Sequence, residues 1–334
     1  MGTPARTANL QTLDGRFRLT ARLAEGGMST IYTAEDLLDE GRPVVVKVPL
    51  PMFSSGVGAW SLFQREEEIG LALDHPFCLR FLPLPVLKGR SYIVTEYVPG
   101  ATLAERLRER GGVLPEPEAL RIASQVCAAV DHVHARGFVH YDVKPENVIL
   151  CPDGTIRLID FGLAHDAVTS RFSLGAMPPA IASSCYVAPE QIRRQRGRKS
   201  VDIYALGAML YEMLTGQPPF PGDDPFVVAS ARTLGDPVAP RAVNPRVSAQ
   251  AEEIVLRALC RNPSDRYPTA AAMKKDLDLP DELLVSGLAA HLQPVTRRRR
   301  FLRLARYIAI VGVLPVVSQV VLFVLLWHHF AHRR

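Results

Sequence analysis

The spacing of hydrophobic residues changes near Val98, and this change constrains the fold more than any other feature of the sequence. Before it, short alternating runs between turn residues predict β-strands, at 17–26, 29–36, 43–50, 81–87 and 91–97, with one helical run at 61–74. After it, apolar residues recur at helical spacing, which predicts helices at 117–137, 200–216 and 248–259. The sequence therefore predicts an α+β, two-lobed fold, with a β-rich lobe at 14–97, an α-helical lobe at 98–280 and a flexible N-terminus at 1–13.

Composition favours a folded chain and excludes several classes of partner. Hydrophobic residues make up 48% and charged residues 22% of the 334 residues. Six of the arginines behind the net charge of +5 lie between Arg297 and Arg306, so the excess charge is local and we expect no nucleic-acid partner. The five cysteines are scattered without a CxxC pair, which argues against a zinc site and against a disulfide framework.

A stretch near the end of the chain has the length and composition of a membrane span. Residues 307–327 carry no charge, and 21 residues at about 1.5 Å each reach roughly 30 Å, the thickness of the hydrocarbon core of a bilayer. Arginines are concentrated in the preceding segment, 281–306, which predicts a basic juxtamembrane linker and a cytoplasmic N-terminal part. We therefore expect a single-pass protein of the plasma (inner) membrane, with the lipid bilayer as a partner and a short tail at 328–334. A buried C-terminal helix is the alternative.

The strongest chemical signal is a cluster of polar residues on one short loop and just after the next hairpin. Asp142, Lys144 and Asn147 lie within six residues, and Asp160 follows in the run Asp160-Phe161-Gly162. Magnesium prefers a few protein oxygens together with phosphate oxygens, and Asn147 and Asp160 can supply the protein side. Asp142 could accept a hydrogen bond from an attacking hydroxyl, and Lys144 could balance the charge on a phosphoryl group.

These residues resemble the catalytic loop and the magnesium motif of the eukaryotic-type (bacterial) serine/threonine protein kinase family. The resemblance covers residues 17–275 and implies ATP and a divalent metal ion as cofactors. The metal is Mg²⁺, with Mn²⁺ as the alternative. The resemblance implies that Lys47 holds the α- and β-phosphates and that Glu66 pairs with this lysine. It also implies a kinase N-lobe and C-lobe, with Asp142 and Lys144 as catalytic residues and Asn147 and Asp160 as metal ligands.

The resemblance also assigns the residues around the nucleotide. The family's glycine-rich phosphate loop corresponds here to a sequence with two departures, since Ala24 and Ser29 stand where glycines are usual. Gly26 and Gly27 still permit a tight turn with amides facing phosphate. Ile31 is expected to cover the adenine, and Thr95 to lie at the back of the nucleotide pocket. Glu96 and Val98 are expected to belong to the hinge beside the adenine.

Residues beyond the ATP site extend the resemblance and bear on the substrate. Glu190, in Ala188-Pro189-Glu190, is expected to pair with Arg266, and Asp202 to bond the backbone of the catalytic loop. Lys144 after Asp142 marks the serine/threonine branch of the family, so the expected partners are protein substrates with Ser or Thr, including the chain itself by autophosphorylation. A small-molecule kinase is a second candidate, and the activation segment argues against it.

A third candidate is a membrane-tethered pseudokinase or scaffold. Its support lies in three departures from the family pattern, namely Ala24, Ser29 and Tyr141. Tyr141 replaces an arginine that grips an activation-loop phosphate in many family members, so we expect little dependence on phosphorylation of that loop. The presence of every catalytic residue named above favours an active enzyme.

Overall fold

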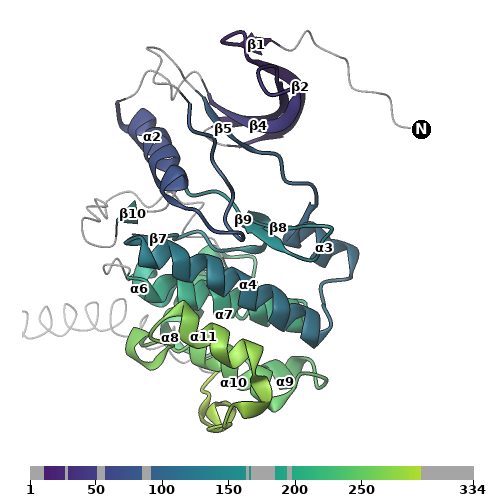
Figure 1. Ribbon diagram of the computed structural model, residues 1–334. Helices are drawn as coiled ribbons and strands as arrows, with labels where there is room; N and C mark the ends of the chain where they lie inside the picture. Colours follow the sequence, from purple (N-terminus) through teal and green to yellow (C-terminus); the bar gives the residue numbers. More distant parts are fainter. Residues whose placement is uncertain are drawn as a thin grey trace, which may run out of the picture.

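The structure is a computed structural model, which describes residues 11–26, 29–50, 57–84, 92–162, 165–166, 185–193 and 198–294. Within these ranges the chain forms a β-rich part above a helical part (Figure 1). The predicted α+β, two-lobed arrangement is confirmed for this region. The predicted membrane span at 307–327 and the activation-loop residues 167–184 lie outside the described residues, as do residues 1–10.

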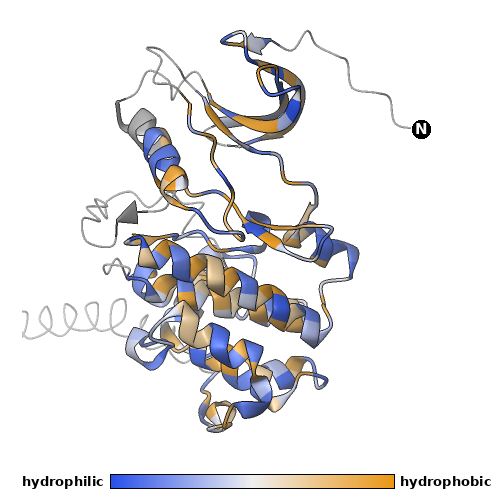
Figure 2. Cartoon of the chain, in the orientation of Figure 1, coloured by the Kyte–Doolittle hydropathy of each residue, from blue (hydrophilic) through white to orange (hydrophobic). Residues whose placement is uncertain are grey.

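The N-lobe is built on a five-stranded antiparallel sheet. Its strands follow the order of the sequence, each paired with the next: β1 Thr12–Leu13, β2 Phe17–Glu25, β3 Ser29–Asp36, β4 Arg42–Pro49 and β5 Ile93–Glu96. Hydrophobic and hydrophilic residues both occur along these strands (Figure 2). In β4 the fully buried Val44 and Val46 alternate with Val45 and Lys47, which point to the opposite face. The alternation directs Lys47 away from the core formed by Val44, Val46 and their neighbours.

One predicted strand is absent from the described part of this region. The sequence predicted strands at 81–87 and 91–97, and the second is present as β5. At the first, the described residues 81–84 form only an isolated bridge, Phe81 to Thr95, and the bond from Leu82 N to Val94 O at 2.9 Å. Pro83 fixes its φ at about −65°, away from the value of about −140° typical of an antiparallel strand, which disfavours continued pairing. Alternating apolar residues alone therefore misled the prediction.

Helix α2, Val57–Ala72, connects the sheet to the helical lobe. It begins earlier than the predicted helical run, which started at residue 61. The buried residues Ile69, in α2, and Leu73, just after it, belong to the same apolar cluster as Ile93 of the sheet and Val126 of the C-lobe. The larger core of the molecule therefore runs from α2 into the helical lobe, whereas the outer face of the sheet has a small core of its own.

The C-lobe contains two small sheets and a set of helices. In the described residues, one sheet has the order β6 Ala101–Thr102, β8 Val148–Leu150 and β9 Ile156–Leu158, and the other pairs β7 Phe138–Val139 with β10 His165–Asp166. The α-helices are α3 Leu103–Glu109, α4 Glu116–Ala135, α6 Pro189–Ile192, α7 Ser200–Thr215, α8 Pro225–Leu234, α9 Pro240–Val243, α10 Ala249–Ala258 and α11 Ala270–Asp278. Short 3₁₀ turns lie at Pro145–Asn147, Pro263–Asp265, Pro280–Glu282 and Leu288–His291.

Helix α7 forms the centre of the C-lobe. Nearly all of its residues are buried, and it packs against both α4 and α10. Gly207 permits the close approach to α10, because a Cβ at this position would lie 2.6 Å from Cβ of Ala258. A helix that is apolar on all sides is expected at the centre of a domain or in a membrane. Within the described ranges, no helix combines the length and the apolar character that crossing a membrane requires.

A buried ion pair joins three parts of the C-lobe. The Arg266 guanidinium donates two parallel bonds of 2.7 Å to the carboxylate of Glu190 in α6. It also donates to the backbone oxygens of Ser200, at the start of α7, and of Cys260, just after α10. The side chains of Arg266 and Glu190 are 0% and 5% exposed, so neither charge has water as an alternative partner.

We expect Arg266→Ala to lower the free energy of unfolding by about 3–5 kcal/mol, because Glu190 would keep a buried charge without its partner. The matched control is Arg18→Ala, which removes an arginine from an ion pair with Glu35 whose side chains are 57% and 37% exposed. This control should lose less than about 1 kcal/mol. Urea unfolding of both variants measures the difference, and equal losses would contradict the structural role assigned to the buried pair.

Candidate active site

A row of side chains crosses the inner face of the N-lobe sheet. Directly opposed residues of neighbouring strands share a face, and the register pairs Ala24 with Ile31, Ile31 with Lys47, and Lys47 with Ile93. Ala24 and Ile31, predicted to cover the nucleotide, therefore lie on the same face as Lys47. Thr95, two residues along β5 from Ile93, shares this face and is 7% exposed.

The turn between β2 and β3 is tight at its described end. Gly26 N donates to Ser29 O at 2.8 Å, which closes the strands around the turn. Ser29 is 6% exposed and lies at the start of β3, opposite Pro49. Gly27 lies outside the described residues. The structure thus places Gly26 at the tip of the hairpin that the resemblance assigns to phosphate, whereas Ser29 is buried behind it.

Three charged side chains from three separate elements meet beneath the sheet. Lys47 Nζ lies 2.7 Å and 2.8 Å from the two carboxylate oxygens of Glu66 in α2. It lies 3.4 Å from Oδ1 of Asp160, which follows β9 in the C-lobe. The ammonium group therefore links α2 and the C-lobe to the sheet.

The charges in this trio shift one another's pKa values. Burial acts to lower the pKa of Lys47, but Asp160 and Glu66 outweigh it, and the net pKa is raised. Burial acts to raise the pKa of Asp160, but the Lys47 ammonium and the Gly162 amide lower it further than burial raises it. Burial raises the pKa of Glu66, with Lys47 acting against the rise. Lys47 and Asp160 are therefore both charged at neutral pH.

The predicted catalytic residues form a connected group on the loop after β7. Oδ2 of Asp142 accepts a bond of 2.7 Å from Lys144 Nζ and one of 2.9 Å from Asn147 Nδ2. Asn147 Nδ2 also donates to the Asp142 backbone oxygen at 2.8 Å. These bonds fix the Asn147 amide with its nitrogen toward Asp142, so its oxygen is the atom available to a metal.

Asp202 of α7 supports this loop from below. Its buried carboxylate accepts bonds of 2.8 Å from the backbone amides of His140 and Tyr141 and from Nε2 of His134 in α4. Burial acts to raise the pKa of Asp202, but the His134 hydrogen bond and the other donors outweigh it, and the pKa is lowered. The ionised carboxylate stabilises Tyr141 in a left-handed conformation, with φ at 66°.

Two predicted metal ligands come together through the backbone. Ile159 N donates to the Asn147 backbone oxygen at 2.9 Å, which places Asp160 beside Asn147. Asp160 adopts φ of 63°, a strained conformation for a residue other than glycine, and Gly162 N donates to its Oδ1 at 3.3 Å. Its side chain remains 44% exposed. A carboxylate and an amide oxygen suit Mg²⁺, so the residues present fit the cofactor that the resemblance implies.

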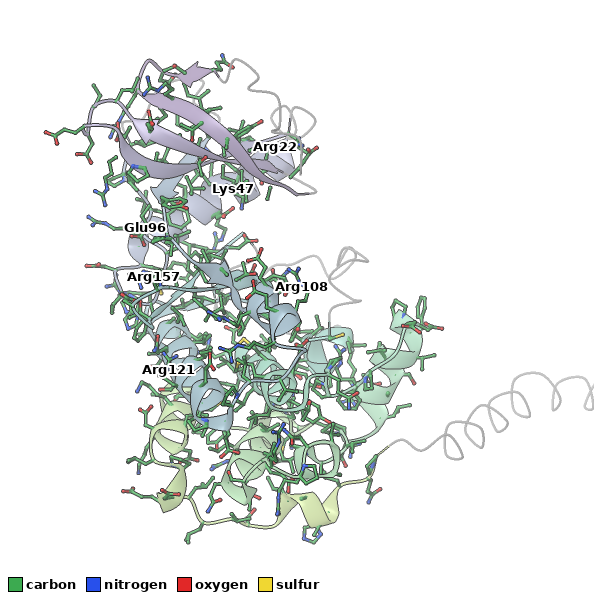
Figure 3. The ribbon with its side chains drawn as sticks, turned by 90° about the vertical axis from the view of Figure 1, so that its right-hand side faces the viewer. Arg22, Lys47, Glu96, Arg108, Arg121 and Arg157 are labelled. Atoms are coloured by element: carbon green, nitrogen blue, oxygen red, sulfur yellow. The ribbon has the colours of Figure 1, made fainter. Side chains whose placement is uncertain are left out.

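The Glu96 side chain has a contact that the sequence did not indicate. Its Oε1 accepts from the Arg80 amide at 3.0 Å and lies 3.7 Å from Nε of Arg157 in β9. Figure 3 shows Glu96 and Arg157 one above the other, between the sheet and the helices, with Lys47 just under the sheet. Glu96 therefore fastens the segment between the lobes, while Val98, the other predicted hinge residue, is half-buried just after it.

A chain of tilted aromatic rings connects the surroundings of α2 to the catalytic loop. The ring centroids of Phe81 and Phe161 lie 6.1 Å apart, and those of Phe161 and His140 lie 5.2 Å apart. At Gly70, one turn after Glu66 in α2, a Cβ would lie 2.3 Å from the Phe81 ring. The missing side chain lets α2 approach Phe81, and this approach helps to hold Glu66 against Lys47.

Sequence reasoning did not foresee several of these contacts, for a common reason. Glu96, His134, Gly70 and Phe81 act through contacts with residues distant in the sequence, and His134 and Asp202 are 68 positions apart. Only Gly70 left a local signal, since glycine in the interior of a helix costs about 1 kcal/mol relative to alanine and therefore suggests a close packing contact.

Comparison with known proteins agrees with this geometry. Residues 17–277 match the family model described as "Protein kinase domain". Since the match covers most of the chain, the protein belongs to the protein kinase domain family. Among solved structures, the chain is similar to the Mycobacterium tuberculosis PknI kinase domain, with a TM-score of 0.62 and 26% identity. That alignment covers 82% of this chain and 100% of the other.

Curated relatives lie within the same branch of the family. The chain is 33% identical to serine/threonine-protein kinase PknB of Mycolicibacterium smegmatis, over 93% of this chain and 55% of the relative. It is 36% identical to serine/threonine-protein kinase PknB of Mycobacterium tuberculosis, over 79% of this chain and 43% of the relative. The chain thus spans about half the length of the curated relatives it matches. The resemblance to bacterial serine/threonine kinases is confirmed.

The contact between Gly70 and Phe81 can be tested by a double-mutant cycle. We expect Gly70→Ala to lower the free energy of unfolding by about 1–3 kcal/mol, because the added methyl group overlaps the Phe81 ring. In a Phe81→Leu background the loss should shrink by at least about 0.5 kcal/mol. Gly207→Ala is the control, since its clash with Ala258 does not involve Phe81. An unchanged loss for Gly70→Ala in the Phe81→Leu background would show that the contact does not constrain α2.

Proposed function

We propose that this chain is a serine/threonine protein kinase, which transfers the γ-phosphoryl group of ATP to hydroxyl groups of proteins. The observation that carries the proposal is the joining of Lys47, Glu66 and Asp160 from three elements, with Asp142 and Asn147 in direct contact beside them. A lysine held between two carboxylates is positioned to bind phosphate oxygens, and its ion pair with Glu66 keeps it extended. The names of the relatives support the same activity.

Each residue of the site has a distinct part in the proposed reaction. Asp142 accepts the proton of the substrate hydroxyl and orients its oxygen toward the γ-phosphorus. Lys144, 2.7 Å from Asp142, supplies positive charge beside the transferred group. Asn147 and Asp160 would hold Mg²⁺, which when bound neutralises charge on the phosphate oxygens. Lys47 binds the phosphates that leave with ADP.

The contacts also favour a protein as the acceptor and an enzyme over a scaffold. The buried Glu190–Arg266 pair anchors the end of the activation segment, a part that the resemblance associates with protein substrates. Lys144 favours serine or threonine as the acceptor residue. The alternative, a membrane-tethered pseudokinase, would give no reason for the strained Asp160 conformation or for the lysine held between Glu66 and Asp160.

We further propose that the chain is anchored in the plasma membrane by residues 307–327, with the kinase domain in the cytoplasm. The support is the uncharged, 21-residue length of this stretch and the arginines that precede it. Anchoring would confine the kinase to substrates near the bilayer.

Two matched substitutions test the phosphoryl-transfer site. We expect Asp160→Asn to reduce transfer from ATP to a generic basic protein by at least about 100-fold, because the change removes the one negatively charged ligand assigned to Mg²⁺. Asp153→Asn makes the same change at an exposed hairpin, where the carboxylate bonds Thr155, and should leave the rate within about twofold. Transfer is measured with radiolabelled ATP and the full chain in detergent. Equal rates for wild type and Asp160→Asn would contradict the proposed site.

Deletion of residues 297–334 tests the membrane proposal. The full chain should stay in the membrane pellet after alkaline extraction, and the shortened chain should be released with its transfer activity intact. The arginines and the apolar stretch are removed together, and every residue placed in the site remains. Extraction of the full chain into the supernatant would contradict the anchor, and an unfolded short chain would favour the alternative of a buried helix.

A further inference from the structure

The segment that follows the last C-lobe helix is held against the C-lobe rather than leaving it directly. Residues 281–294, which the sequence assigns to the linker, continue past α11 through two short 3₁₀ turns. The second turn, Leu288–His291, packs against α10. The segment ends beside Asp236, whose amide donates to Gln293 O at 3.3 Å and whose Oδ2 accepts from Gln293 N at 2.9 Å. We call residues 286–294 the docked segment.

A single carboxylate holds the start of the docked segment. Glu253 of α10 is 5% exposed, and its two oxygens accept bonds from the amides of Ser286, at 3.1 Å, and Leu288, at 3.3 Å. The hydroxyl of Ser286 also donates to Glu253. Gly287, at φ of 85°, lets the amides on either side reach the same carboxylate.

Ser286 combines this contact with access from solvent. The residue is exposed, in an extended stretch whose neighbours Leu284 and Val285 are 90% and 46% exposed. Its hydroxyl is therefore within reach of another protein, although it rests on a buried carboxylate. Within the described ranges, no lysine or arginine forms an ion pair with Glu253, so no such pair balances the charge of this carboxylate.

We propose that Ser286 is a phosphorylation site whose modification releases the docked segment from the C-lobe. A phosphoserine carries a charge of about −1.5 to −2 at neutral pH, and its dianion has no proton to donate to Glu253 in place of the lost hydroxyl. The like charges repel at a carboxylate that is itself only 5% exposed, and the repulsion opposes the two backbone bonds to Glu253. Release of the nine residues 286–294 would lengthen the connection to residue 295 by up to about 30 Å.

The phosphate donor is ATP, bound to a second copy of this chain, so the inference rests on the proposed function. Figure 1 shows α10 at the far end of the C-lobe from β7 and β8, which flank the catalytic loop, so Ser286 beside α10 is remote from its own site. Oγ of Ser286 forms a bond to the γ-phosphorus of ATP, the bond from this phosphorus to the β,γ-bridging oxygen breaks, and ADP leaves. The hydroxyl proton passes to Asp142 of the second copy.

The first experiment asks whether Ser286 accepts phosphate from another copy. A small amount of wild-type full chain is mixed with excess Asp160→Asn full chain, ATP and Mg²⁺, and the peptide containing residue 286 is examined by mass spectrometry. We expect phosphate on Ser286 of the Asp160→Asn chain and none when Ser286→Ala is added to it. Glu253→Gln in the acceptor should speed the labelling, because the weakened contact exposes the hydroxyl more often.

A generic basic protein in the same mixture separates the possible failures. If it is labelled and Ser286 is not, the inference is wrong and the proposed function stands. If neither is labelled, both fail.

The second experiment tests the release without using the kinase activity. Full chain with phosphoserine incorporated at position 286 during synthesis is compared with the unmodified chain by hydrogen exchange. We expect exchange in peptides covering 286–293 to be faster by about tenfold or more, because like charges now oppose docking. Ser286→Ala should keep most of its protection, since both amide bonds to Glu253 remain. Unchanged or stronger protection in the phosphorylated chain would overturn the proposal.

Discussion

The organisation of the site depends on one buried carboxylate. Asp202 lies at the start of the most buried helix and accepts hydrogen bonds from two consecutive amides of the catalytic loop and from His134. A charge in such a place is stable only when hydrogen-bond donors surround it, so the loop and α4 must meet α7 in one arrangement. That arrangement sets the backbone from which Asp142 and Asn147 project, and through the bond from Ile159 to Asn147 it also places Asp160. The positions of the C-lobe residues of the site therefore depend on the packing of α7.

The N-lobe positions Lys47 through the alternation of side chains along β4. Val44 and Val46 face a small apolar core, and this commits Lys47 to the other face, where Glu66 and Asp160 meet it. Because Glu66 comes from a helix and Asp160 from the other lobe, the ion trio exists only when α2 lies close to the sheet. The fit of Phe81 against Gly70 serves the same end on the same face of α2, one turn after Glu66. The ion pair of Glu66 and the apolar contact of Gly70 thus both hold α2 close to the sheet.

Much of this arrangement could be predicted from the sequence, and what could not has a physical explanation. Strands with clear alternation and the long amphipathic α4 were predictable, because their periodicity is local. The strand expected at 81–87 does not continue past Leu82 in the described residues, because the fixed φ of Pro83 disfavours an extended strand despite the apolar pattern. The resemblance pointed to Lys47 and Glu66 together, although nothing local joins them. The contacts of Glu96 with Arg157 and of Glu253 with Ser286 connect distant residues without a recognisable motif, so only the folded chain reveals them.

The central claim is that this site transfers the γ-phosphoryl group of ATP to protein hydroxyls. It is tested most directly by incubating the full chain and a generic protein acceptor with ATP labelled at either the γ- or the α-phosphorus, followed by acid hydrolysis and analysis of the labelled amino acids. The account predicts phosphoserine and phosphothreonine from γ-labelled ATP, no phosphotyrosine, and no label on protein from α-labelled ATP. Release of free phosphate with no labelled protein, or label confined to tyrosine, would contradict it.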